Sequence, residues 1–332
     1  MKPKALLAYS LGHFWVDFSC ALLMFSLSGQ GDWALCVLLY NFSAFALQMP
    51  IGLLADQWNR NSRTAALGCG LAALGWALSP IPVAAALSAG LGNACFHVGG
   101  GIQVLEDGGD RAAPLGVFVS PGAFGIFFGT LLGRSSGFSG LAAAAGLLGF
   151  ALGFCLLESR GEGKPAPSAR DLNRNVLWAL ACCFLVVVLR SYLGMILSFP
   201  WKTGAWSLWV ICAVVSGKAA GGFLGDRLGM LPASVLSLGL STVLFCLSGF
   251  PLAGTAAVFF FNMTMPITLW AAAQLLPDRK GFAFGMLTFA LFLGFLPVWL
   301  GWPPLLHGGS GYAVGALCSL ALLVLGLKRG RF

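Results

Sequence analysis

Charged residues are scarce in this sequence. Only 9% of its 332 residues are Asp, Glu, Lys or Arg, and 58% are hydrophobic, whereas roughly a quarter of the residues in a soluble domain are charged. A chain of this length has too little polar surface to dissolve as a globule, so we expect its surroundings to be lipid. The composition therefore excludes a soluble domain and predicts a polytopic membrane protein.

The motifs of enzymes and of metal chemistry are also absent. The ten cysteines are scattered through apolar runs apart from the Cys182-Cys183 pair, with no CxxC spacing, which is typical of small packing residues. The sequence contains no HExxH motif, no nucleophile and base pair and no His-rich loop, and its loops leave no room for a catalytic domain outside the membrane. We therefore expect no enzymatic activity, no cofactor and no structural metal.

Long apolar runs occupy most of the chain. A helix needs about 20 apolar residues to cross the hydrocarbon core, and the runs do not alternate as strands would. We count twelve such windows, at approximately 5–28, 32–55, 64–80, 82–105, 114–133, 139–158, 174–199, 205–224, 231–249, 252–276, 282–305 and 310–327. The sequence thus predicts an all-α protein with twelve transmembrane helices. The first window begins after Met1-Lys2-Pro3-Lys4 and shows no clear cleavage site, so we expect it to be retained.

One polar stretch divides the chain. Residues 159–173 have the composition of a flexible linker, with six apolar windows before them and six after. We predict an N-terminal six-helix bundle over 1–158, a cytoplasmic linker over 159–173 and a C-terminal six-helix bundle over 174–332.

Basic residues indicate the orientation. The loops on the side of the two termini hold fifteen of the nineteen, and the opposite loops hold only Arg134 and Lys202. Since positive loops stay inside, both termini should be cytoplasmic and the protein should lie in the cell membrane. The net charge of +8 is spread over short loops and forms no patch, so we expect no nucleic-acid partner. The fifteen are Lys2, Lys4, Arg60, Arg63, Arg111, Arg160, Lys164, Arg170, Arg174, Arg227, Arg279, Lys280, Lys328, Arg329 and Arg331.

A motif occurs twice, 170 residues apart. GLLAD at 52–56 is followed by Arg60 and Arg63, and GFLGD at 222–226 is followed by Arg227. A membrane domain made twice in tandem is typical of transporters. The pattern resembles the cytoplasmic loop signature of the major facilitator superfamily, which implies two pseudo-symmetric six-helix bundles and a monomer. In the first copy Asn59 replaces the usual Gly, and Asn tolerates a left-handed turn almost as Gly does.

Four shorter runs resemble the fosmidomycin-resistance branch of that superfamily. They are HFWVD at 13–17, GNACFH at 92–97, RS at 190–191 and QLLPDRKG at 274–281. The resemblance implies secondary active transport of a small molecule, typically proton-driven drug efflux. It also implies that the first, fourth, seventh and tenth spans line the transport cavity.

Asp17 is the only acidic residue deep in a predicted span. A carboxylate in lipid either pairs with a cation or takes up a proton. His13 lies one helical turn earlier on the same face, and imidazole titrates near neutral pH. We therefore predict that Asp17 and His13 couple transport to protons; the alternative is a static pair that holds the first helix to its neighbours.

Four further polar residues are predicted to bind the substrate. His97 and Asn93 lie in the fourth span, Arg190 in the seventh and Asn262 in the tenth. An intramembrane arginine needs an anion or a set of carbonyls, so we expect a small organic solute that is anionic or amphipathic. An Arg190–Asp17 salt bridge is the structural alternative. Lys218, four residues before Gly222, is expected to reach toward the membrane interface.

The repeated motif is predicted to form the inner gate. Asp56 and Asp226 end the second and eighth spans, where each can accept hydrogen bonds from a neighbouring helix N-terminus and pair with arginine. The predicted gating residues are Gly52, Asp56, Arg60, Arg63, Gly222, Asp226 and Arg227.

Two other functions stay open. The first is proton-coupled uptake of an organic anion. The second is a divalent-metal carrier that uses His13, Asp17 and His97, although no fourth ligand is evident in the sequence.

The predicted topology can be tested by labelling introduced thiols with an impermeant reagent. Thiols near Gly31 and Gly308 should react from outside intact cells, and thiols near Asn61 and Pro165 should react only after permeabilisation. Labelling of the linker from outside would exclude this topology.

Overall fold

The computed structural model describes residues 3–135, 137–157 and 173–332, and these residues form helices and connecting turns. The predicted linker lies outside the described residues apart from Asn173, whose side chain accepts from the amide of Val176 and so caps the next helix. The elements, in chain order, are α1 (Pro3–Ser26), α2 (Trp33–Asn41), η1 (Phe42–Ala46, a π-helix), α3 (Gln48–Trp58), α4 (Asn61–Ala77), α5 (Pro82–Gly108), α6 (Ala113–Val119), α7 (Pro121–Ser135), α8 (Gly140–Leu156), α9 (Arg174–Ile196), α10 (Ala205–Leu228), α11 (Met230–Cys246), α12 (Pro251–Asn262), α13 (Thr264–Leu275), α14 (Lys280–Trp299) and α15 (Gly308–Gly330).

Each of the twelve predicted windows coincides with a helical stretch, but only eight are long and apolar enough to cross a membrane by length and composition. Helices α4, α8 and α11 have 17 residues each, about 26 Å of helix, a little less than a core of roughly 30 Å. Helix α5 is longer but carries Asn93 and His97. The all-helical class is confirmed for the described residues, and the twelve-span arrangement stays a prediction.

Proline accounts for the interruptions inside three spans. A proline ring clashes with the carbonyl four residues earlier and offers no amide hydrogen. Pro50 stands four residues after Ala46, where η1 ends, and Pro266 stands four residues after Asn262, where α12 ends. Pro121 begins α7 directly after the break at Ser120. The second, fifth and tenth predicted spans are therefore each built from successive helical pieces.

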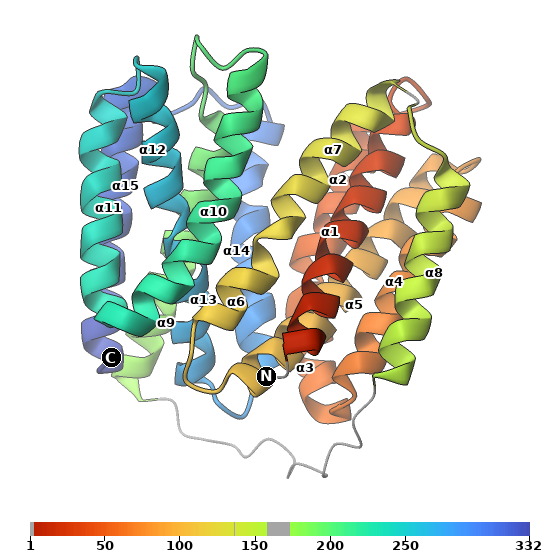
Figure 1. Ribbon diagram of the computed structural model, residues 1–332, viewed down its shortest axis with the longest axis horizontal. Coiled ribbons are helices and arrows are strands. Elements are labelled where there is room, and N and C mark those ends of the chain that lie inside the picture. The colour runs from red at the N-terminus through yellow and green to blue at the C-terminus, as the bar shows by residue number, and fades with distance from the viewer. Residues whose placement is uncertain (1–2, 136, 158–172) are drawn as a thin grey trace. The chain divides into compact units, whose positions relative to one another are not determined.

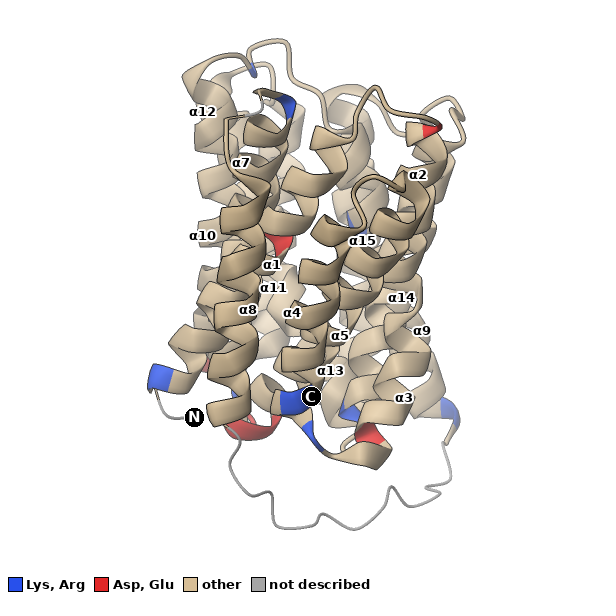
Figure 2. Cartoon of the chain, turned by 90° about the vertical axis from the view of Figure 1, so that its right-hand side faces the viewer, with Lys and Arg blue, Asp and Glu red and all other residues tan. Residues whose placement is uncertain are grey.

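The chain divides into two compact units. Unit 1 comprises the described residues of Met1–Asp107, Pro121–Ser168 and Asp278–Phe289, and unit 2 those of Gly108–Ser120, Ala169–Pro277 and Ala290–Phe332. Helix α6 and the second part of α14 thus belong to unit 2, while α7 and the first part of α14 belong to unit 1. Figure 2 shows the acidic and basic residues mainly at helix ends and in turns, which leaves the long helix surfaces almost uncharged.

In unit 1, α1 packs most extensively against α7 (Figure 1). Four glycines of α7, at 122, 125, 129 and 133, form one face, and a Cβ at any of them would meet α1. Small residues let two helices approach closely in a membrane protein. This close approach brings α7 directly against the segment of α1 that carries His13 and Asp17.

Candidate functional site

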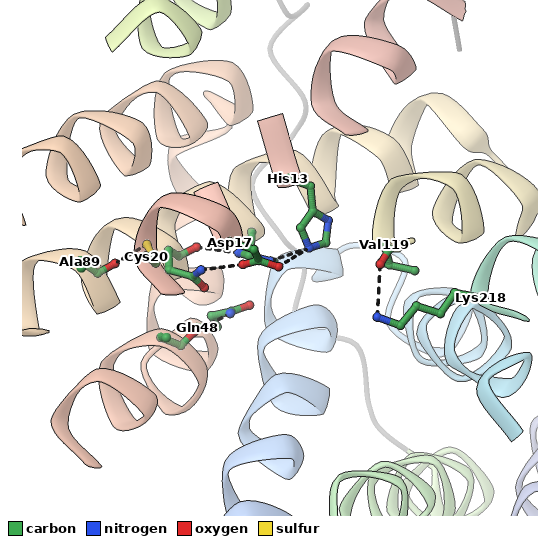
Figure 3. A network of polar contacts seen from close by, with 10 residues as sticks. His13, Asp17, Cys20, Gln48, Ala89, Val119 and Lys218 are labelled. Atoms are coloured by element: carbon green, nitrogen blue, oxygen red, sulfur yellow. Dashed lines mark hydrogen bonds and ion pairs between the residues drawn. The ribbon is translucent and has the colours of Figure 1, made fainter. Parts of the chain in front are cut away.

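A cluster of four polar side chains lies inside unit 1. His13 and Asp17 come from α1, and Asn93 and His97 come from α5; all four are at most 9% exposed. His13 Nε2 lies 3.2 Å from Asp17 Oδ2, and Figure 3 shows the two side chains pointing toward each other. Their spacing of one helical turn explains this contact. We call these four residues the α1–α5 cluster.

Helix α5 supplies the second half of the cluster. Asn93 Nδ2 donates to Asp17 Oδ1 at 2.9 Å. His97 Nε2 lies 3.7 Å from the same oxygen and 2.9 Å from His13 Nε2. The sequence placed Asn93 and His97 with the substrate and His13 and Asp17 with the proton, whereas the structure joins all four in one network.

The hydrogen bonds determine which ring nitrogen of His97 carries its proton. His97 Nδ1 lies 2.9 Å from the backbone carbonyl oxygen of Asn93. A carbonyl oxygen only accepts, so Nδ1 carries the hydrogen and Nε2 of the neutral ring presents its lone pair toward His13. His13 Nε2 then donates, because two lone pairs do not form a hydrogen bond. The network therefore holds a proton between the two rings.

The charge of the cluster depends on one further proton. Both ion-pair partners of Asp17 in the described part of unit 1 are histidines. With neutral rings the cluster carries the single negative charge of Asp17, and an unbalanced charge in a low-dielectric interior is costly. Protonation of either imidazole makes the cluster neutral. The arrangement is thus suited to take up and release one cation.

Helix α7 packs directly against this network. A Cβ on Gly122 would collide with Asp17 Oδ2 and His13 Nε2. Any residue larger than glycine at this position would therefore press on these two groups. Gly122 is not among the site residues predicted from the sequence.

Arg190 occupies a different environment, in unit 2. Its side chain is 8% exposed, and NH1 donates to Thr268 Oγ1 at 3.3 Å. Thr268 in turn donates to carbonyl oxygens of α13, so it is held in place by its own helix. A guanidinium has five N–H donors, and this hydroxyl is the one hydrogen-bond partner found for them within the described residues of unit 2. Thr268 was not identified from the sequence, where a buried threonine has no distinguishing signal.

Asn262, the other residue assigned to the substrate in this part of the chain, is positioned differently. Its Nδ2 donates to the carbonyl oxygen of Val258 at 2.8 Å, in the last turn of α12. This bond lies within its own helix. A role for Asn262 in binding stays a prediction.

The two repeated aspartates have the same surroundings. Asp56 at the end of α3 accepts from the amides of Gly281 and Phe282 at 2.7 and 2.9 Å, in the first turn of α14. The first amides of a helix lack partners within it and favour a negative charge. Asp56 therefore caps a helix remote from it in sequence.

Asp226 repeats this arrangement in unit 2. It accepts from the amides of Ala112 and Ala113 at 2.6 and 3.0 Å, at the start of α6. The arginine that pairs with it is Arg111, at 3.6 Å, which the sequence did not single out. We call the Asp56–α14 and Asp226–α6 contacts the two aspartate clamps.

The motif glycines and the turns after the aspartates also correspond. A Cβ on Gly52 would collide with the backbone of Gly281, and a Cβ on Gly222 would meet Ala112 and Ala113. Asn59 and Gly229, each three residues after its aspartate, both have a positive φ, of 51° and 90°. The left-handed turn expected at Asn59 is confirmed.

The other predicted gating residues lie on the borders of the clamps. Arg60 precedes α4, Arg63 is exposed in its first turn, and Arg227 is exposed in the last turn of α10. Their roles stay predictions.

Gln48 and Lys218 stand at equivalent positions of the repeat and both contact an interrupted helix. Gln48 is fully buried and its Nε2 donates to Ala44 in η1 at 2.5 Å. Lys218 donates to the carbonyl of Val119 at 3.4 Å, where α6 ends (Figure 3). The lysine expected to reach toward the interface therefore binds a backbone carbonyl at the break in the fifth span.

Solved structures of several transporters match the structure of this chain along nearly its whole length. The structure matches the E. coli fucose:proton symporter FucP with a TM-score of 0.71 in its outward conformation, at 17% sequence identity over 99% of each chain. It matches the human organic anion transporter TETRAN with a TM-score of 0.72, at 15% identity over 98% of this chain and 100% of that one. The chain has the major facilitator fold. No family model and no curated protein matches it by sequence.

The major facilitator fold agrees with the eight apolar stretches, so the chain is a multi-pass membrane protein. A third match is a bacterial homologue of the iron transporter ferroportin, with a TM-score of 0.63 at 15% identity over 98% of each chain. These neighbours include a fucose:proton symporter and an organic anion transporter, so the fold alone does not select a substrate.

The aspartate clamps can be tested by hydrogen exchange. Replacing Asp56 by Asn leaves a single acceptor oxygen and removes the charge, so the amides of Gly281 and Phe282 should exchange about tenfold faster or more, since hydrogen bonds to charged groups contribute roughly 1.5–3 kcal/mol. Asp226→Asn should have the same effect on Ala112 and Ala113 only, so each variant controls for the other. Unchanged exchange at both helix starts would show that the carboxylates do not hold them.

Proposed function

We propose that the chain is a secondary active transporter of the major facilitator superfamily that exports a small organic anion in exchange for protons. The observation that carries the proposal is the α1–α5 cluster, a buried carboxylate whose partners in unit 1 are two histidines and an amide. Polar groups inside a membrane protein are costly and mark ion or substrate paths. A cluster that becomes neutral on taking up one proton is suited to couple a proton gradient to transport.

Within this proposal the histidines and Asp17 act as one proton-binding group. His97 belongs to this group rather than to the substrate site, because its Nε2 contacts His13 and its Nδ1 is occupied by the Asn93 carbonyl. Asn93 orients the carboxylate through its amide nitrogen. The proton is taken up on one side of the membrane and released on the other as access alternates.

The anion is assigned to Arg190. Its guanidinium is buried and positively charged, and among the described residues of unit 2 it is bonded to the neutral hydroxyl of Thr268. A carboxylate or phosphonate fits the planar fork of a guanidinium in a bidentate manner, which compensates both the charge and the unused donors. The salt bridge of Arg190 with Asp17, considered from the sequence, remains the alternative for the protein without substrate.

The aspartate clamps are proposed as the inner gate. Each clamp joins the end of one span to the start of another by two hydrogen bonds to a carboxylate, a contact that can form or break as a unit. Breaking them would free the starts of α6 and α14. Alternation between the clamped and released states is the proposed gating step.

Direction, orientation and assembly follow from the sequence. Efflux rests on the resemblance of residues 13–17, 92–97, 190–191 and 274–281 to the fosmidomycin-resistance branch, with uptake of an organic anion as the alternative. Both termini are proposed to be cytoplasmic, in the cell membrane, with the chain acting as a monomer. A divalent metal is the other candidate cargo, because ligand atoms of His13, Asp17 and His97 lie within 4.8 Å of one another.

The coupling role predicts a specific defect in Asp17→Asn. In proteoliposomes this variant should lose solute movement driven by a pH gradient but keep downhill solute exchange, because the carboxylate that balances the imidazolium is gone while Arg190 is intact. Asp32→Asn is the matched control. Asp32 caps the start of α2 by accepting from the amide of Leu35, and Asn caps a helix as well as Asp does, so this change should leave transport unaltered. Uphill transport by Asp17→Asn in response to a pH gradient would disprove the assignment.

The anion site predicts a loss of affinity in Arg190→Lys. Lysine keeps the charge but lacks the fork, so binding of a carboxylate or phosphonate probe, followed by calorimetry, should weaken about 10- to 150-fold, the equivalent of one lost charged hydrogen bond of roughly 1.5–3 kcal/mol. Arg174→Lys, an exposed change on the same helix, should have no effect. Equal anion affinity in Arg190→Lys would remove Arg190 from the site.

A further inference from the structure

We propose that His13, Asp17 and His97 form a binding site for a divalent transition-metal ion such as Zn²⁺, and that a bound metal blocks transport by occupying the place of the coupling proton. The metal site itself is argued from geometry. The block rests on the proposed function, because it needs the cluster to be the coupling site.

The donor atoms lie close to the spacing of a zinc site. Donors bound to Zn²⁺ at about 2.0–2.1 Å in a tetrahedron lie about 3.3–3.4 Å apart. The two histidine Nε2 atoms are 2.9 Å apart; His13 Nε2 lies 3.2 Å from Asp17 Oδ2, and His97 Nε2 lies 3.7 Å from Asp17 Oδ1. One ligand atom from each residue lies within 4.8 Å of the other two, so a rotation of the carboxylate that presents one oxygen to both rings would bring the three donors toward the tetrahedral spacing.

The hydrogen bonds around the donors prepare them for a metal. His97 donates from Nδ1 to the Asn93 carbonyl, which leaves Nε2 with its lone pair facing the cluster. Partners of this kind orient metal-binding histidines and are worth about 10–100-fold in metal affinity. Asn93 also holds one oxygen of Asp17 through Nδ2. One residue therefore orients two of the three ligands.

Helix α7 packs directly against two of the donors. Gly122 borders both Asp17 Oδ2 and His13 Nε2, and a Cβ there would collide with both atoms. Glycine at this position therefore leaves the donors undisturbed. Zinc sites with three protein ligands take water or another small ligand as the fourth, so the three residues of the cluster match the protein part of such a site.

The ligand types select the metal. Imidazole suits Zn²⁺, Cu²⁺, Fe²⁺ and Ni²⁺, whereas Mg²⁺ and Ca²⁺ prefer sites made of oxygen. Binding to His13 Nε2 displaces the hydrogen that this atom carries, because a metal ligand must be deprotonated. The metal and the shared proton therefore exclude each other.

Metal binding is tested on the purified full-length protein with Zn²⁺ by calorimetry and with Co²⁺ by visible absorption. We expect one ion per chain and a Co²⁺ spectrum of a four- or five-coordinate site with nitrogen and oxygen ligands, and no competition from Mg²⁺. His97→Ala and His13→Ala should weaken binding by more than 100-fold. His307→Ala, which changes the exposed third histidine, is the matched control.

Gly122→Ala tests the site without removing a ligand. Its methyl group would press on two of the donor atoms and should weaken metal binding strongly, whereas Gly153→Ala, where a Cβ meets no atom within 4 Å, should not. Asn93→Leu should weaken binding about 10–100-fold. Thermal melting without metal checks that each variant is folded. No saturable binding by the parent protein, or binding by both single-histidine variants as tight as that of the parent, would overturn the site.

The block is tested in proteoliposomes with Zn²⁺ added during solute transport and with a zinc-sensitive dye inside. Inhibition of pH-driven solute transport by the parent protein, without zinc entry, supports the proposal, and unchanged transport at zinc concentrations that saturate the purified protein would overturn the block. Zinc accumulation inside the vesicles would overturn the block in favour of a metal cargo. Arg190→Lys should bind Zn²⁺ like the parent, so failure of the anion proposal and failure of the metal site give different results.

Discussion

The negative charge of Asp17 is the constraint on which much of unit 1 depends. A carboxylate that is 7% exposed needs balancing charge and hydrogen bonds from its neighbours. The chain meets this need with residues of two helices, since α1 supplies His13 and α5 supplies Asn93 and His97. The third helix, α7, contributes no ligand but approaches closely enough through its glycines to bury the group. Its ion-pair partners among the described residues of unit 1 are the two histidines, a chemistry suited to bind a proton or a metal ion.

The internal repeat gives both units the same capping contact, in which an aspartate at the end of one helix accepts from the first amides of another. In each copy a motif glycine allows close contact, an aspartate three residues before a residue with positive φ caps the start of a remote helix, and the next span begins directly after that turn. Each clamp lies within one compact unit, since Asp56 and the first part of α14 belong to unit 1, and Asp226 and α6 belong to unit 2.

The two units differ in the charge that they bury. Within the described residues, unit 1 holds Asp17 beside two histidines, and unit 2 holds Arg190 bonded to the Thr268 hydroxyl. The repeat extends to Gln48 and Lys218, which both bind a carbonyl beside an interrupted helix, yet one is neutral and the other charged. A shared backbone plan thus carries a buried acid in one unit and a buried base in the other.

The sequence by itself determined the helical class, the places where helices begin and end within a few residues, the turn at Asn59 and the contact of His13 with Asp17 on one helix face, because apolar length, turn residues and helical spacing are local signals. Which other residues surround Asp17 was decided by tertiary structure: His97 joins His13, Asn93 holds the carboxylate and Gly122 packs against it. The pairing of Arg111 with Asp226 in unit 2 was decided in the same way. These contacts join residues up to about a hundred positions apart, and the rotation of each helix about its axis follows from packing against its neighbours, which no local pattern records.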